Sequence, residues 1–196
     1  MWSREGLSRG TLAQVPFPVF GVAWGPDADQ LAYGAGRFLS VRSIIPGGKS
    51  NEWKAHDATV LTVDWNPISG LLASGGEDRR FKIWDSDGRL VFQSPVQESV
   101  ITSVAWNPSG DLLAVGSFST VVLCDKSGWS HCKVRVDTGS LYGISWTADG
   151  TQFAAAGGNG AVCFCQLVGE ALESGKVRVT LDKPNRCEVS AASHAP

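Results

Sequence analysis

Long apolar runs and blocks of like charge are absent from this 196-residue sequence. No stretch approaches the ~18 consecutive apolar residues of a membrane-spanning helix. The 17 Lys and Arg residues nearly balance the 19 Asp and Glu residues, and they form no basic block typical of nucleic-acid-binding proteins. The first residues, Met1 to Gly6, lack the apolar core of a secretory signal. We therefore expect neither membrane insertion nor a nucleic-acid partner.

Cysteine is scarce, and its number is odd. The five cysteines lie mostly inside apolar runs, which favours reduced thiols in an intracellular compartment over a disulfide framework. Cys163 and Cys165, together with the pair His131-Cys132, invite a zinc interpretation. Zinc sites usually place two ligand pairs on tight turns, whereas Cys163 and Cys165 alternate along an apolar strand and share one face. We expect buried strand cysteines and no metal site.

Tryptophan, in contrast, recurs at a nearly constant interval. Trp24, Trp65, Trp106 and Trp146 follow one another after 41, 41 and 40 residues, and each ends a short apolar run. A period of about 40–45 residues indicates one supersecondary unit repeated along the chain. Stacks of such units usually present extended surfaces for protein partners.

The second repeat shows the unit most completely. Alternating apolar segments predict four strands, and Pro, Gly, Ser and Asp residues between them predict tight turns. The expected strands are 60–65, 71–75, 81–85 and 89–93. Four short antiparallel strands in about 40 residues are typical of a propeller blade. The Gly and Ala residues of the second strands indicate close packing between neighbouring blades.

Trp84-Asp85 is the dipeptide after which the WD repeat is named, and the second repeat resembles a WD40 blade. The resemblance implies a buried network of His56, Ser74, Asp78 and Trp84. In it a carboxylate holds an imidazole, the imidazole a hydroxyl, and the hydroxyl an indole N–H, so no buried polar group is left unpaired. We expect this network to fix the geometry of the blade.

The other repeats lack these residues, so apolar packing alone must hold them. The position of His56 is taken by Val15, Gln97 and Asp137, and that of Trp84 by Cys124 in the third repeat.

The predicted fold is all-β: a WD40 β-propeller segment of about four four-stranded antiparallel blades, with partial blades at the ends and no closed ring. Residues 10–14 are expected as the last strand of a preceding blade, and 176–181 as the fourth strand of the last one. The predicted boundaries are 1–16 (end of a preceding blade), 17–57, 58–97 (full WD signature), 98–137, 138–182, and 183–196 (start of a further strand and a tail). Closed propellers have roughly 4–8 blades, and seven is usual for WD repeats, so we expect a segment of a larger protein.

Besides the general resemblance to WD40 repeats, the sequence shows a more specific one. The segments 22–27, 53–57, 101–106 and 114–118, and above all Leu123-Cys-Asp-Lys-Ser-Gly-Trp-Ser130, resemble a family of WD-repeat subunits of intraflagellar transport complex B. The last of these strings departs from the ordinary WD pattern and is therefore the most specific. The family's members are much longer than this chain, and the last seven residues do not match them.

The resemblance implies a non-catalytic scaffold that acts in cilium assembly and ciliary transport. It implies other complex B subunits as partners, and a location in the cilium or flagellum, the basal body and the cytoplasm. A generic WD40 adaptor, such as a substrate receptor of a ubiquitin ligase, is the alternative within binding proteins. A propeller enzyme is the third hypothesis, and it would need carboxylates or a metal that converge on the axis.

Two motifs suggest catalysis or nucleotide binding at first sight. Pro46-Gly-Gly-Lys-Ser50 resembles a phosphate loop, but Ser43 stands where that motif needs glycine, so a surface loop is the better interpretation. His56, Asp78 and Ser74 resemble a hydrolase triad, but the repeat position of each residue explains them as structural. We expect no catalytic residue, no cofactor and no small-molecule substrate.

The turn after Asp78 carries two adjacent basic residues, Arg79 and Arg80. Such pairs are usually only solvated. If a partner contacts the face that bears these turns, the first candidates for the contact are Asp57, Arg79, Arg80 and Phe118.

Overall fold

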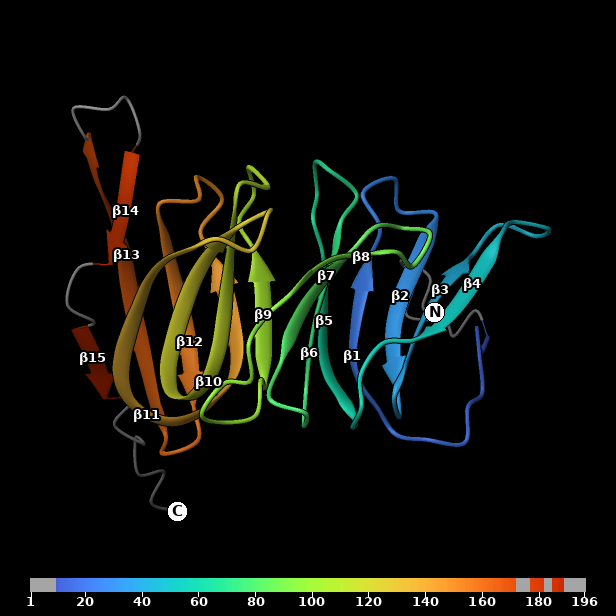
Figure 1. Cartoon of the computed structure of the whole chain (residues 1–196), viewed down its shortest axis with the longest axis horizontal. Helices are drawn as coiled ribbons and strands as arrows, with labels where there is room; N and C mark the ends of the chain where they lie inside the picture. Colours follow the sequence, from blue (N-terminus) through green and yellow to red (C-terminus); the bar gives the residue numbers. More distant parts are fainter. Residues whose placement is uncertain (1–9, 172–176, 182–184, 189–196) are drawn as a thin grey trace, which may run out of the picture.

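The computed structural model describes residues 10–171, 177–181 and 185–188, and this part of the chain contains fifteen strands and no helix. The predicted fold class is confirmed: antiparallel four-stranded units follow one another along the molecule without closing into a ring (Figure 1). The predictions made for residues 1–9 and 189–196 concern residues outside the described part of the chain. Residues 10–14, expected as a strand, carry none, and the first strand begins at Val19.

The first two sheets follow the predicted pattern closely. One sheet has the order β1-β2-β3-β4 and the next has the order β5-β6-β7-β8, each in sequence order. The first sheet contains β1 (Val19–Trp24), β2 (Gln30–Ala35), β3 (Phe38–Ser43) and β4 (Ser50–Lys54). The second contains β5 (Val60–Trp65), β6 (Leu72–Gly76), β7 (Phe81–Trp84) and β8 (Leu90–Gln93). The predicted strands of the second repeat agree with these bounds to within one residue.

The remaining strands form one seven-stranded sheet. They are β9 (Ser103–Trp106), β10 (Leu112–Asp125), β11 (Ser130–Trp146), β12 (Gln152–Gly157), β13 (Ala161–Ala171), β14 (Val177–Leu181) and β15 (Asn185–Glu188).

Two of these strands each contain a reversal of the chain. Residues 113–116 of β10 pair with β9, whereas residues 118–124 pair with β11, and the register with β11 shifts between Phe118 and Thr120. Ser119 in β10 and Gly139 in β11 have positive φ angles of 48° and 68°. The ribbons of β10 and β11 accordingly turn back at the lower end of the sheet in Figure 1. The seven-stranded sheet therefore contains two further four-stranded units, which β11 connects by contributing one half to each.

We call the four units blades. The first is β1–β4 and the second is β5–β8. The third combines β9, β10 and the first half of β11, and the fourth combines the second half of β11 with β12, β13 and β15.

The fourth blade ends differently from the expectation. Residues 162–166 of β13 pair with β12, and residues 161–164 pair on the other side with β15. The segment 177–181, expected as the fourth strand, is β14 and pairs with residues 167–171 instead. The reason is length: β13 has 11 residues against 6 in β12, so its far half extends beyond the blade and meets β14 there.

Apolar clusters hold the blades together. Each cluster contains residues from the second and third strands of one blade. It also contains residues from the first strand of the next blade and from the strands that neighbour this first strand. At the first joint Leu39 and Val41 of β3 pack with Val63 and Trp65 of β5. At the second, Phe81 and Ile83 of β7 pack with Val104 and Trp106 of β9. Burying each such side chain stabilises the fold by about 1.5–3 kcal/mol.

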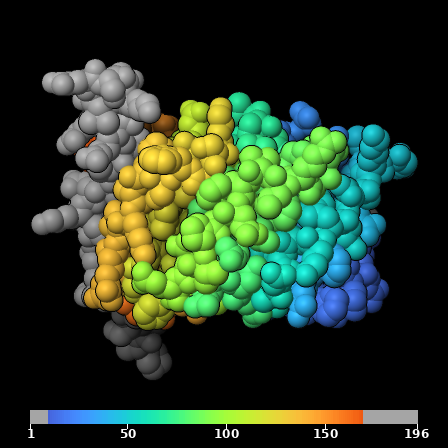
Figure 2. Space-filling model, viewed as in Figure 1, coloured from blue at the N-terminus to red at the C-terminus, as the bar shows by residue number. Residues whose placement is uncertain are grey.

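Small residues let the blades approach each other. The second strands place Ala32, Ala73 and Ala114 at the joints, and all three are fully buried. A Cβ atom added to Gly75 would overlap with Ile101 of the next blade. The expected packing role of glycine and alanine follows from these contacts. The packed blades appear as one continuous body in Figure 2, where the chain around β8, in green, crosses the front obliquely.

Candidate functional site

The four marker tryptophans occupy the same place in each first strand but differ in exposure. Trp65 and Trp106 are buried, at 5% exposed each. Trp146 is half-buried, and its indole N–H donates to the Ala105 carbonyl across a blade joint (3.0 Å). Trp24 is 51% exposed. The buried markers are covered by a preceding blade, and the first strand of the first blade is open.

The structure brings His56, Ser74, Asp78 and Trp84 into one chain of hydrogen bonds. The imidazole Nδ1 lies 2.9 Å from both carboxylate oxygens of Asp78, and Nε2 lies 2.8 Å from Ser74 Oγ. The indole N–H of Trp84 donates to Ser74 Oγ at 2.9 Å. Because a carboxylate only accepts, Nδ1 carries the proton, and the Ser74 hydroxyl donates to Nε2.

Burial governs the ionisation of this imidazole. His56 is 1% exposed, and burial lowers its pKa below the ordinary value although the hydrogen bond and the charge of Asp78 oppose the change. The neutral imidazole is the form that can accept from Ser74. The arrangement resembles a hydrolase triad in composition only, because the Ser74 side chain is fully buried and already accepts an N–H from Trp84.

Asp78 also connects the network to two surface turns. Its carboxylate accepts the backbone N–H of Asp57 (3.2 Å) and that of Arg80 (3.2 Å). Asp57 lies between β4 and β5, and Arg80 lies between β6 and β7. The network therefore orders the turns that carry three of the four residues expected at a partner surface.

These turns lie at one end of the blades. Because β5 and β6 are antiparallel, the segment before β5 and the turn after β6 share an end, which is the lower end in Figure 1. The reversal of β10 at Phe118–Ser119 lies at this end too. We call it the lower loop face and define it by Asp57, Arg79, Arg80 and Phe118.

The four residues of the lower loop face are not equally available. Arg79 is exposed with a φ of 61°, and the Phe118 side chain is 57% exposed. Asp57 is exposed and lies 3.0 Å from Lys54 Nζ, whose hydrogen bond lowers the pKa of the carboxyl. Arg80 is half-buried, and its guanidinium donates to the Ser94 carbonyl at 2.6 Å. Arg79 and Phe118 are thus open, whereas Arg80 is held by the blade.

Sequence reasoning did not single out a polar link between the second and third blades. Asp64 Oδ2 accepts the backbone N–H of Trp106 (2.7 Å), and Thr62 Oγ1 accepts that of Val104 (3.2 Å). Burial raises the pKa of Asp64 to about 6, against the opposing effect of the Trp106 and Trp65 N–H groups. The available signal was an acidic residue inside an apolar run, where the first and third repeats have Ala23 and Ala105.

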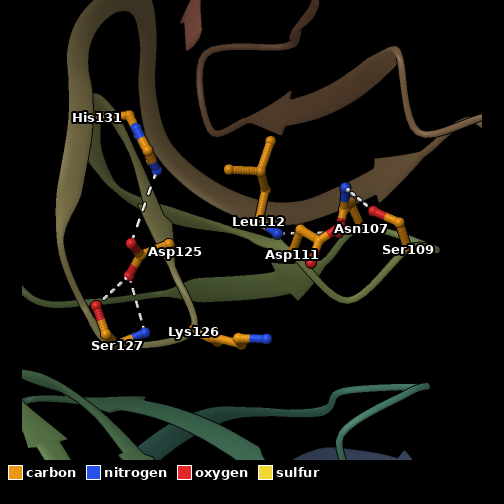
Figure 3. A pocket seen from close by; sticks show the side chains of 8 residues that line it. All are labelled: Asn107, Ser109, Asp111, Leu112, Asp125, Lys126, Ser127 and His131. Atoms are coloured by element: carbon orange, nitrogen blue, oxygen red, sulfur yellow. Dashed lines mark hydrogen bonds and ion pairs between the residues drawn. The ribbon is translucent and has the colours of Figure 1, made fainter. Parts of the chain in front are cut away.

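An open pocket of about 490 Å³ lies beside the turns of the third blade and is lined mostly by polar residues (Figure 3). His131 Nε2 points toward Asp125 Oδ2 at 4.0 Å, while Asp125 Oδ1 accepts from the backbone and hydroxyl of Ser127. Burial raises the pKa of Asp125, but these bonds and that from Trp129 outweigh it and leave the pKa below the ordinary value. The acidic group therefore serves to hold its own turn.

Four of the five cysteines, Cys124, Cys132, Cys163 and Cys165, lie in or beside the apolar clusters at the blade joints. Cys124, Cys163 and Cys165 are buried, and burial raises the pKa of Cys124 and Cys165 to about 12. A thiol with such a pKa is protonated and unreactive at neutral pH. Within residues 10–171, 177–181 and 185–188, no group of three His, Cys, Asp or Glu residues is placed to hold a metal ion. The same part of the chain contains no helix long and apolar enough to cross a membrane.

Comparisons with known proteins agree with this architecture. The family model "WD domain, G-beta repeat" matches residues 47–85 and 89–124. The intraflagellar transport protein 80 homologues of Rattus norvegicus and Mus musculus are each 48% identical over 189 residues, which is 96% of this chain. The F-box-like/WD repeat-containing protein TBL1X of Homo sapiens is 30% identical over 129 residues, 58% of this chain.

The chain spans 24% of the length of the two intraflagellar transport relatives and 22% of the human TBL1X protein. Residues 47–85 and 89–124 of the chain are therefore WD repeats, and nearly the whole chain is similar to part of the two intraflagellar transport protein 80 homologues.

Proposed function

We propose that this chain is a non-catalytic, protein-binding scaffold segment of an intraflagellar transport complex B subunit. The observation that carries the proposal is the 48% identity over 96% of the chain to two intraflagellar transport protein 80 homologues. On this proposal the segment works in cilium assembly and ciliary transport. It resides in the cilium or flagellum, at the basal body and in the cytoplasm, and its partners are other complex B subunits.

The architecture supports a scaffold. Blades at fixed intervals present turns of adjacent blades on one surface, which suits contact with another protein. The catalytic alternative has little support, because the Ser74 hydroxyl is buried and bonded on both sides. The blade boundaries proposed with this function are 17–57, 58–97 and 98–137, and the fourth blade begins at 138 and includes β15.

The lower loop face is the proposed contact surface. Arg79 and Phe118 project from adjacent blades, and the Asp78 carboxylate orders the turns on which Asp57 and Arg80 lie. Arginine and aromatic residues are both enriched at the centre of protein interfaces.

The first experiment expresses the tagged 196-residue chain in ciliated cells and identifies the proteins that copurify with it. We expect complex B subunits to copurify and the tag to label cilia. Recovery of ubiquitin-ligase subunits without complex B subunits would instead support the generic WD40 adaptor. The similarity to the F-box-like TBL1X protein is the observation that favours this alternative.

The second experiment locates the surface. Arg79→Glu should reduce the recovery of partners at least tenfold, and Phe118→Ala should reduce it several-fold. Arg89→Glu is the matched control, because Arg89 is also exposed but lies in the turn before β8, at the opposite end of the blade. Arg80 is avoided because its substitution would also break the bond to Ser94. Unchanged recovery with both variants would exclude the lower loop face.

A further inference from the structure

One asparagine of the sequence is followed directly by glycine. The sequence has five asparagines, and only Asn159 has a glycine, Gly160, as its next residue. The backbone nitrogen of the next residue can attack the side-chain amide carbon Cγ of an asparagine, because a bond between these atoms closes a five-membered ring. A side chain on the next residue hinders this approach, and glycine has none. Asn159 is therefore the asparagine whose covalent neighbour best allows the reaction.

The turn that contains Asn159 is open to solvent. Asn159 and Gly160 connect β12 to β13, and both residues are exposed. Gly160 has a φ of 81°, in the left-handed region that favours glycine, and a Cβ atom added to it would meet no other atom within 4 Å. Water and hydroxide therefore reach the Gly160 nitrogen and the Asn159 side chain from bulk solvent.

The hydrogen bonds of this turn bring the reacting groups together. Asn159 Oδ1 accepts the backbone N–H of Ala161 at 3.1 Å, which folds the side chain over the peptide group that contains the Gly160 nitrogen. The same bond places a donor on the oxygen where negative charge develops when a nucleophile attacks Cγ. The Gly160 N–H donates to the Gly157 carbonyl at 3.2 Å, the long end of the usual range. The turn thus holds the amide carbon beside a nitrogen that is only weakly restrained.

The other asparagines with described side chains lack one of these conditions. Asn66 and Asn107 are buried, and each precedes a proline, whose nitrogen carries no hydrogen to lose. Asn51 is exposed, but it is followed in β4 by Glu52, whose side chain hinders the approach. Asn51 is therefore an internal comparison for Asn159.

From these contacts we propose that Asn159 deamidates spontaneously in the folded protein, with the Gly160 nitrogen as the nucleophile. This nitrogen loses its proton to hydroxide and bonds to Cγ, the bond from Cγ to Nδ2 breaks, and ammonia leaves with a proton from water. Water then opens the resulting succinimide. Attack at Cγ yields aspartate, and attack at the backbone carbonyl carbon yields isoaspartate, whose main chain runs through the former side chain. One amide and one water thus become one carboxylate and one ammonium ion, without an oxidant or a reductant.

The product loses the brace of the turn. The Asn159 amide donates to the Asp137 carbonyl at 3.1 Å, and a carboxylate at this position cannot donate. In the second blade, Asp78 at the equivalent position contacts the imidazole of His56. The fourth blade has Asp137 in the place of His56. The new carboxylate therefore has an acidic residue where the second blade supplies a donor.

The same turn supports the reversals of β11 and β10. The Asn159 backbone N–H donates to the Thr138 carbonyl at 3.2 Å. The Gly139 N–H next to it donates to Ser119 Oγ at 3.1 Å. Deamidation of Asn159 therefore loosens a connection that runs from the fourth blade to the reversal of β10.

The first experiment incubates the 196-residue chain at 37 °C between pH 7 and pH 9 and locates modified residues by peptide mass spectrometry. We expect the peptide with Asn159 to gain about 1 Da, as aspartate and isoaspartate, and to do so faster at higher pH, because hydroxide removes the Gly160 proton. Asn51 should react about tenfold more slowly, because its attacking nitrogen is hindered. An Asn159 that stays unmodified, or that reacts no faster than Asn51, would overturn the proposal.

Gly160→Ala tests the identity of the nucleophile. The added methyl group hinders the nitrogen and should slow the reaction at Asn159 by about tenfold. Far-UV circular dichroism checks that this variant is folded, and the comparison with Asn51 in the unmodified chain decides the proposal if it is not. A folded variant that reacts at the original rate would show that the Gly160 nitrogen is not the nucleophile.

A further measurement identifies the folded protein as the species that reacts. The rate at Asn159 is measured at several urea concentrations below the unfolding transition. It should stay constant, because the turn is already exposed in the folded state. A reaction that required unfolding would accelerate with each increment of urea, since the unfolded fraction rises steeply with urea concentration. Such an acceleration would overturn the proposal.

Amide hydrogen exchange measures the effect on the turn. In Asn159→Asp the backbone amides of Gly139 and residue 159 should exchange about tenfold faster, because one hydrogen bond of the turn is lost. Asn51→Asp is the matched control, because it also removes a side-chain donor to a backbone carbonyl, that of Asp87 (2.7 Å), but in the first blade. It should leave both amides unchanged. Equal exchange in Asn159→Asp and in the unmodified chain would exclude the loss of the brace.

Discussion

The second and fourth blades have the same strand order but different interiors. In the second, His56, Ser74 and Trp84 bond to one another inside the blade. In the fourth, the positions of Ser74 and Trp84 are taken by Ala155 and Cys165, which are buried in an apolar cluster with Phe153. Both interiors produce the same antiparallel sheet. The spacing of apolar residues therefore specifies the sheet, and the polar network is an addition that only one blade uses.

The difference extends to the surface. The Asp78 carboxylate joins the network of the second blade to the turns at Asp57 and Arg80. The corresponding turn of the fourth blade contains Asn159, which accepts the Ala161 N–H and donates to the Asp137 carbonyl. Both residues brace a turn, but only Asp78 also holds a buried imidazole. The second blade thereby couples its interior to the lower loop face.

The largest expected effect concerns the apolar interior of the fourth blade. Phe153 is fully buried, and its ring lies 4.9 Å from that of Trp146. Phe153→Ala should lower the free energy of unfolding by about 3–5 kcal/mol, because it removes apolar contacts and leaves a cavity. Urea denaturation at one fixed protein concentration measures the change. Phe118→Ala, at an exposed position, should change it by less than about 0.5 kcal/mol. Equal losses for the two variants would contradict the assignment of the core.

A second substitution tests the polar joint between the second and third blades. The pKa of Asp64 is raised from 3.8 to about 6 in the folded protein, so folding favours the protonated form. Its contribution to stability is full below pH 3.8 and is lost as the pH rises through 6. Asp64→Asn should therefore raise the free energy of unfolding at pH 8 by about 3 kcal/mol, the equivalent of a shift of about two pKa units.

The same variant should lose its advantage below about pH 4, where Asp64 is protonated in both states. Urea denaturation at pH 8 and at pH 3.5 checks both expectations. Asp111→Asn, on an exposed side chain, is the control and should change neither value. A gain that is the same at both pH values would show that ionisation of Asp64 is not its cause.

A third substitution converts the second blade toward the fourth. Ser74→Ala places the residue of the fourth blade at the centre of the network. It leaves the Trp84 N–H and His56 Nε2 without partners, which should cost about 1–3 kcal/mol. The exposed Ser86→Ala should cost almost nothing. If thermal and urea unfolding do not distinguish the two variants, the network contributes nothing that apolar packing does not already supply.

The smallest expected effect concerns the pH dependence of the network. The pKa of His56 is lowered by burial, so the stability it contributes is present above pH 6.5 and is lost as the pH falls below that value. This direction is opposite to that of Asp64, so the measurement belongs in the Asp64→Asn background. Between pH 7.5 and 5.5 that variant should lose stability, and adding His56→Gln should flatten the curve. A curve that stays equally steep after His56→Gln is added would contradict this assignment.

Part of the candidate site could be predicted from the sequence, and part could not. The positions of His56, Ser74, Asp78 and Trp84 follow from their place in the repeat, and the structure brings them together. The difference in exposure between Arg79 and Arg80 could not be predicted from the sequence. It depends on the Ser94 carbonyl, which β8 brings to the Arg80 guanidinium. The link from Asp64 to the Trp106 N–H joins residues 42 apart, so no local pattern could reveal it.

The strand boundaries divide in the same way. In the second blade, turns with Pro, Gly and Asp separate the strands clearly, and the predicted bounds hold. The reversals at Ser119 and Gly139 lie inside the strands β10 and β11. The segment 177–181 pairs with the extension of β13 and not with the blade. Local turn chemistry shows where a chain can turn, but it does not show which strand will be beside it afterwards.

By itself the sequence determined the repeat: a period of about 41 residues, the alternation of apolar side chains and the glycine-marked turns produce one antiparallel sheet after another. Those features act over a few neighbouring residues, so they can be recognised without coordinates. Only the tertiary structure decided which copy of a repeated residue is buried. Trp65 and Trp106 are covered by a preceding blade and Trp24 is not, because burial depends on what packs against a strand and not on the strand itself.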